Sequence, residues 1–68
     1  MKFNPEKFVV ARRAAGLSTR ALAAKAGVSA QTVNRAERGK HVPFGLTLAA
    51  MCKALGVEVR EVCDVDVP

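Results

Sequence analysis

At 68 residues, the chain can hold one small domain, for which we expect the bounds 1–68, and it is too short for a multidomain enzyme. Aromatic residues make up only 4% of it against 50% hydrophobic residues in all, which favours short, closely packed helices. The net charge of +5 is unevenly distributed along the chain. Residues 1–57 hold ten basic and two acidic side chains, whereas residues 58–68 hold one basic and four acidic side chains. A basic body of this kind favours nucleic acid as partner, ahead of an anionic membrane surface.

No pattern in the sequence indicates catalysis, a metal or a cofactor. Cys52 and Cys63 are too few for a disulfide framework and fit no zinc-finger spacing, and His41 has no neighbouring ligand in the loop that holds it. No paired carboxylates precede Glu58, and no glycine-rich phosphate loop is present. The apolar runs are too short for a signal peptide or a membrane span. We therefore expect a cytoplasmic, non-enzymatic protein without metal, cofactor or small-molecule ligand.

The first predicted helix runs from Pro5 to Ala15. Asn4 can cap it, and proline is favourable at a first helical position. Phe3 and Phe8 then fall at the two positions of a hydrophobic staple, so we expect their rings to pack together.

Two shorter helices are predicted at residues 19–26 and 30–38. Ser18 caps the first of them and Ser29 the second. Because only residues 27–29 separate them, the two helices must cross steeply. Small or apolar residues fall where they must touch: Leu22, Ala23, Ala26, Val28, Val33 and Ala36.

A fourth helix should open at Pro43, after a basic loop, and end at Gly56. One face of it forms an apolar stripe at helical spacing, made of Leu48, Met51, Cys52 and Leu55. This stripe is expected to lie in the core.

The segment after the fourth helix has two interpretations. Residues 57–61 alternate as in a strand, whereas Val59, Val62 and Cys63 share a helical face. We favour a short fifth helix and expect residues 64–68 to be frayed.

One face of the third helix is polar and cationic. It presents Ala30, Gln31, Asn34, Arg35 and Arg38. Asparagine and glutamine can pair with the adenine edge in two-point fashion, and arginine can pair with the guanine edge. This face therefore has the chemistry that the major groove of DNA requires.

The chain resembles the lambda repressor and Cro family of helix-turn-helix proteins over about residues 8–62. The resemblance rests on the segment from Leu17 to Lys40, on Pro43 after the basic loop, and on Ala54-Leu55-Gly56-Val57. It implies a compact all-α domain of four to five helices, with the helix-turn-helix at the second and third.

The resemblance also implies roles for individual residues. Base contacts are expected from Ala30, Gln31, Asn34 and Arg35. Phosphate contacts are expected from Thr19, Arg20, Lys40 and the backbone amides near Phe44 and Gly45. A structural ion pair is expected between Arg12 and Glu37, and Arg38 is expected only to complement the helix dipole. Two positions depart from the family pattern. Ala30 is short, so specificity there should either rest on contact with a thymine methyl group or be lax, and Gly45 replaces an apolar residue.

These expectations lead to a sequence-specific regulator that binds double-stranded DNA, of the phage or prophage Cro or repressor kind, and acts by occupying an operator. The alternative is a protein-interaction adaptor on the same fold, such as an anti-repressor or antitoxin module. An adaptor would tend to carry apolar residues at Gln31, Asn34 and Arg35. A membrane-surface peptide is disfavoured, because caps and glycines indicate a compact fold.

One recognition helix reads too few base pairs to define a unique site. We therefore expect a two-fold homodimer on a near-palindromic operator, weak in solution and firmer on DNA. Its candidate interface consists of apolar residues outside the predicted core: Phe44, Leu46, Val57, Val59 and Val65.

Overall fold

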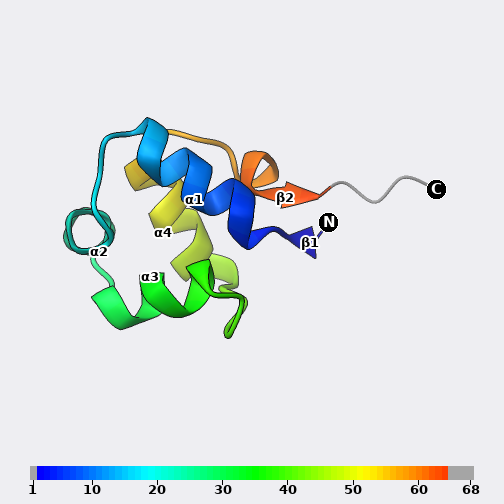
Figure 1. Ribbon diagram of the computed structural model, residues 1–68, viewed down its shortest axis with the longest axis horizontal. Coiled ribbons are helices and arrows are strands. Elements are labelled where there is room, and N and C mark those ends of the chain that lie inside the picture. The colour runs from blue at the N-terminus through cyan, green and yellow to red at the C-terminus, as the bar shows by residue number, and fades with distance from the viewer. Residues whose placement is uncertain (1, 65–68) are drawn as a thin grey trace.

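A computed structural model describes residues 2–64, and helices dominate them (Figure 1). The elements in chain order are β1 (Lys2–Phe3), α1 (Pro5–Ala14), α2 (Thr19–Ala26), α3 (Ala30–Glu37), α4 (Gly45–Leu55), the 3₁₀ turn η1 (Val59–Val62) and β2 (Cys63–Asp64). The predicted all-α fold class is confirmed, with one two-residue strand pair added to the helices that the structure describes.

The first three helices begin where their caps predict. The side chain of Asn4 accepts hydrogen bonds from two backbone N–H groups of α1, and Ser18 and Ser29 each accept one from α2 and α3. These bonds satisfy N–H groups that have no partner inside a helix. At the other ends, α1 stops at Ala14 and α3 at Glu37, each one residue earlier than predicted.

The predicted start of the fourth helix is wrong by two residues. Pro43 is fully buried and precedes α4, and Phe44 after it is extended, with φ −130° and ψ 161°. Gly45 then has φ +53°, a left-handed conformation that only glycine adopts without strain. The chain therefore turns sharply at Gly45, and no continuous helix can run through Pro43.

The segment after α4 departs from both interpretations of its sequence. The favoured fifth helix is only the 3₁₀ turn η1, and the alternating residues 57–61 form no strand; the chain extends only after them, as β2. β2 pairs antiparallel with β1, which the sequence did not predict, and places Phe3 opposite Cys63. Asp64 belongs to this pair, so the expected fraying is wrong at that residue, while residues 65–68 lie outside the described part.

Side-chain contacts from Asn4 and Lys7 to Asp64 stabilise the strand pair. The amide of Asn4 donates to both carboxylate oxygens of Asp64, at 3.0 and 3.2 Å, and Lys7 Nζ lies 3.1 Å from the same carboxylate. These two partners hold the pKa of Asp64 below its ordinary value. Lys7 also donates to the backbone oxygen of Cys63. Asn4 thus caps α1 and anchors the last described residue at once.

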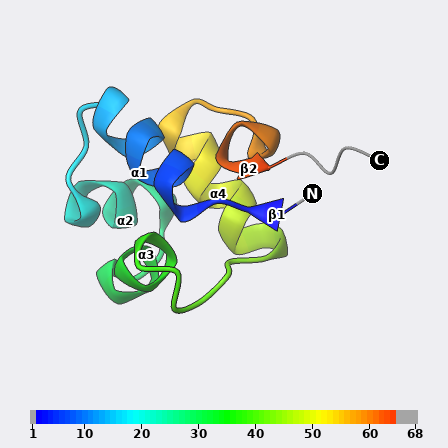
Figure 2. The ribbon, with the colours of Figure 1, turned by 45° about the vertical axis from the view of Figure 1, so that its right-hand side comes forward.

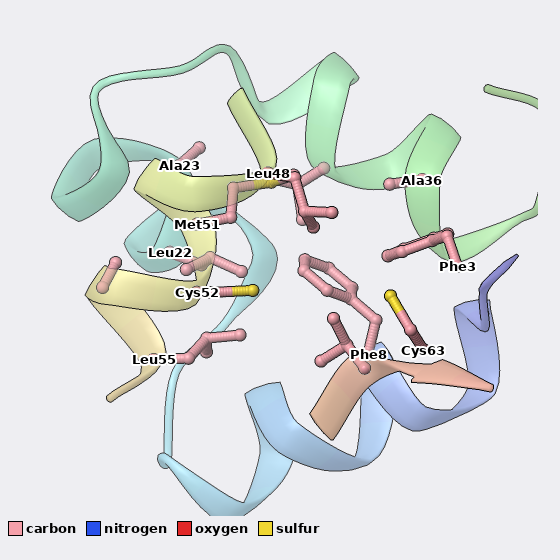
Figure 3. Close-up of a cluster of buried hydrophobic side chains, with 13 residues drawn as sticks. Phe3, Phe8, Leu22, Ala23, Ala36, Leu48, Met51, Cys52, Leu55 and Cys63 are labelled. Atoms are coloured by element: carbon pink, nitrogen blue, oxygen red, sulfur yellow. The ribbon is translucent and has the colours of Figure 1, made fainter. Parts of the chain in front are cut away.

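Helices α1 to α4 and η1 enclose one hydrophobic core (Figure 3). Phe8 is completely buried, and its ring centroid lies 5.7 Å from that of Phe3, as the staple predicts. The apolar stripe of α4 is buried as expected. Burial raises the pKa of the Cys52 thiol, so this group stays protonated and unreactive at neutral pH.

Replacing Phe8 should remove most of the stability of the domain. We expect Phe8→Ala to lower the free energy of unfolding by about 3–5 kcal/mol, because it leaves a cavity at the centre of the core. Urea unfolding followed by circular dichroism measures the loss. Val10→Ala is the matched control, since Val10 is on the same helix and 67% exposed, and it should change stability by less than about 0.5 kcal/mol. Equal losses for both variants would contradict this description of the core.

Candidate nucleic-acid interface

The turn between α2 and α3 fixes the angle at which these helices meet. Gly27 ends α2 with φ +74°, and the N–H of Val28 donates back to the oxygen of Ala23 at 3.0 Å. Ser29 then caps α3 through the N–H of Thr32 and also bonds its hydroxyl. In Figure 1, α2 is seen end-on, whereas α3 runs across the view. The two helices therefore cross steeply, as predicted.

Small side chains let α2 and α3 approach each other. Leu22 and Ala23 of α2 and Val33 and Ala36 of α3 are all buried in one cluster. Ala26 and Val28, the other two predicted contacts, are half-buried against the same core. One side of α3 therefore faces the core. Figure 2 shows α3 at the lower edge of the molecule, so its other side faces outward.

The outward side of α3 carries most of the predicted base-reading residues. Gln31, Asn34 and Arg35 are exposed and line one hollow on the surface. Ala30 is half-buried, packs against the core and is not part of that hollow. The complete hollow, here called the α3 hollow, is lined by Gln31, Asn34, Arg35, Arg38 and Lys40.

Two residues that line the α3 hollow, Arg38 and Lys40, were not predicted to contact bases. Lys40, a predicted phosphate contact, is brought to the hollow because its N–H donates to the oxygen of Arg35 at 3.0 Å and folds the loop back against α3. Arg38 was expected only to complement the helix dipole, yet it lies in the same hollow. Its spacing of seven residues from Gln31 was the available signal, since positions i and i+7 share a helix face.

The other predicted phosphate contacts lie at helix N-termini. Thr19 is half-buried and Arg20 exposed in the first turn of α2. Phe44 precedes α4 and gives it no side-chain hydrogen bond, unlike the caps of α1, α2 and α3. The N–H groups near Phe44 and Gly45 thus lack a side-chain cap, and such groups attract anions.

Arg12 and Glu37 are in contact and join α1 to the end of α3. Arg12 donates to the two carboxylate oxygens of Glu37, from Nε at 2.5 Å and from Nη2 at 3.2 Å. Its Nη1 donates to the backbone oxygen of Leu17 at 2.9 Å. The side chains of Arg12 and Glu37 are only 14% and 12% exposed. The pair therefore holds α1, the α1–α2 loop and α3 together close to the candidate interface.

The candidate dimer residues differ in exposure. Phe44 is 75% and Leu46 90% exposed, so both are free of the core. Val57 and Val59 are half-buried and pack against the core, so the premise that the core does not use them is wrong. Val65 lies outside the described residues.

Other kinds of site find little support in residues 2–64. They hold no group of three or more potential metal ligands. The thiols of Cys52 and Cys63 are free and buried, and His41 is exposed in the loop after α3. None of the helices described is long and apolar enough to cross a membrane.

Comparison with known proteins identifies a family and similar solved structures. The family model described as a helix-turn-helix domain matches residues 10–64. The chain is similar to the crystal structure of the restriction-modification controller protein C.AhdI from Aeromonas hydrophila, with 29% sequence identity and a TM-score of 0.80. That similarity covers 85% of this chain and 88% of the other. Curated proteins give no match.

Removing one partner of the Arg12–Glu37 pair should cost more than removing both. Glu37→Ala leaves a partly buried guanidinium without its counter-charge, and we expect a loss of roughly 2 kcal/mol in the free energy of unfolding. The double variant Arg12→Met with Glu37→Met should lose less, because no unpaired charge remains. Urea unfolding measures both.

The exposed pair of Lys7 and Asp64 provides the control for this experiment. Their side chains are 49% and 54% exposed, so Asp64→Asn should cost less than Glu37→Ala. A Glu37→Ala variant as stable as Asp64→Asn would show that the buried pair contributes nothing special.

Proposed function

The chain belongs to the helix-turn-helix domain family of DNA-binding regulators, and we propose that it represses transcription by occupying a specific double-stranded operator. The observation that carries the proposal is the outward face of α3. Gln31, Asn34 and Arg35 are exposed together on the side opposite the buried Val33 and Ala36. Such a helix fits the major groove, where amides recognise adenine and guanidinium groups recognise guanine.

In this proposal the contacts divide into two kinds. Gln31, Asn34 and Arg35 read bases, and Ala30, outside the α3 hollow, is limited to a thymine methyl group. Thr19, Arg20, Lys40 and the amides near Phe44 and Gly45 hold phosphates on either side and fix the register of α3. The Arg12–Glu37 pair keeps the end of α3 in place but touches no DNA.

The setting of the regulator is a second part of the proposal. A phage or prophage repressor and a controller of restriction-modification genes are both consistent with a small helix-turn-helix protein. The likeness to C.AhdI favours the second setting, since it extends over 85% of the chain. The adaptor alternative is disfavoured because the outward face of α3 is polar and cationic rather than apolar.

Selection of bound duplexes from a random pool, followed by footprinting of the preferred duplex, tests the proposal directly. We expect one preferred sequence with a protected segment on it. A chain that enriches no sequence and protects no segment would instead favour the adaptor.

Substitutions in the α3 hollow should separate base reading from phosphate binding. Gln31→Ala and Arg35→Ala should each weaken binding to the selected duplex by about 1–3 kcal/mol and affect random duplex much less. Lys40→Ala should weaken both alike and reduce the slope of log affinity against log salt by about 0.9. Titrations at several salt concentrations measure these effects, with the exposed Lys53→Ala in the last turn of α4 as control. Equal losses on both duplexes for all three variants would rule out α3 as the reader.

Dimerisation on DNA is the remaining expectation. We propose a two-fold dimer that places two copies of α3 in successive major grooves, with half-site centres roughly 34 Å apart. The exposed Phe44 and Leu46 are the apolar side chains available for contact, and they form only a small interface. Sedimentation should therefore show monomers at low concentration and two chains on a palindromic duplex. Leu46→Glu should abolish the second binding step, whereas one chain per duplex at saturation in the unchanged protein would refute the dimer.

A further inference from the structure

Arg38 is the C-cap residue directly after α3 and keeps a helical backbone conformation, with φ −88° and ψ 0°. It follows Gln31 by seven residues, Asn34 by four and Arg35 by three, so its side chain extends the face of α3 that carries those three. The exposed side chain of Arg38 lines the α3 hollow together with them and with Lys40. A base-pair edge that enters this hollow therefore meets Arg38 as well as the expected readers.

The guanidinium of Arg38 is available for a ligand. Arg38 also lines a second hollow, which contains the acids Glu6, Glu37 and Asp64. Glu37 is engaged by Arg12 through two hydrogen bonds, and Asp64 is engaged by Asn4 and Lys7. Within residues 2–64, neither an ion pair nor a hydrogen bond of the structure involves the side chain of Arg38. An unengaged guanidinium presents its planar fork of donors, which matches the two acceptors of a guanine edge.

The first residue of α3, Ala30, can distinguish few DNA bases, so base recognition must rely on residues nearer the end of the helix, where Arg38 lies. Ala30 offers only a methyl group, and that group is half-buried against the core. Discrimination between bases must therefore come from later positions of the helix. Arg38 lies about 10 Å along the helix axis from Gln31, a distance of about three base-pair steps. Lys40 lies in the same hollow, so its phosphate contact would hold this end of α3 against the duplex.

We propose that Arg38 is a further specificity-determining residue, which recognises guanine at the outer end of each half-site. This inference rests on the proposed DNA-binding function and extends it to a residue whose expected role was only to complement the helix dipole. The planar fork of arginine matches O6 and N7 of guanine in two-point fashion, and a lysine ammonium does not reproduce that geometry. A base contact depends on the base pair that is present, whereas a phosphate contact does not, so comparing the selected duplex with random duplex separates the two roles.

The experiment compares Arg38→Lys, Arg38→Ala and the control Arg60→Ala on the duplex selected by the unchanged protein. Arg60 is exposed on η1, which lies in Figure 1 at the edge of the molecule opposite α3. We expect both Arg38 variants to lose affinity for the selected duplex about tenfold or more relative to random duplex. Repeating the selection with Arg38→Ala should identify one outer position where the preference for guanine disappears. The Arg60 variant should keep the full ratio.

Replacing that guanine by 7-deazaguanine, which lacks the N7 acceptor, completes the test. The unchanged protein should lose affinity by a similar factor, and Arg38→Ala should lose nothing more. If Arg38→Ala weakens selected and random duplex alike, or if 7-deazaguanine leaves the affinity of the unchanged protein unaltered, the inference is overturned. If the unchanged protein itself enriches no sequence, the proposed function fails, and the inference fails with it for that separate reason.

Discussion

The connection between α2 and α3 has three residues, and the orientation of the candidate base contacts on α3 depends on it. Gly27 takes a left-handed conformation and Ser29 caps the next helix, so the chain changes direction within one turn. Because Ala23 is small, α3 can then pack closely against α2 with Val33 and Ala36 inward. Once that side is buried, the opposite side must face solvent. The same packing that stabilises the core therefore presents Gln31, Asn34, Arg35 and Arg38 together.

Contacts from outside the helix pair keep α3 in this position. The Arg12–Glu37 pair connects its last residue to α1 and also binds the loop before α2. Phe8 from α1 fills the centre of the core, and the strand pair holds α1 to the segment after α4. A helix of eight residues such as α3 is too short to be stable alone, so its geometry depends on these neighbours.

The distribution of charge on the surface depends on ion pairs inside the fold as well as on the sequence. Glu37, the only acid on α3, forms an ion pair with Arg12. It therefore does not neutralise Arg35 or Arg38 on the outward face. Asp64 is likewise engaged by Asn4 and Lys7 at the strand pair. The described residues that line the α3 hollow are three cations and two amides, a set suited to bases and phosphates.

The sequence by itself determined the first three helices, the steep crossing and the polar face of α3. Those features follow from local interactions, because caps act within three residues and helical faces from a fixed period. It could not place the start of α4, because neither the burial of Pro43 nor the left-handed conformation of Gly45 is visible in the local pattern. Nor could it pair β1 with β2, which lie at opposite ends of the described chain. Only tertiary packing decides where such distant segments meet.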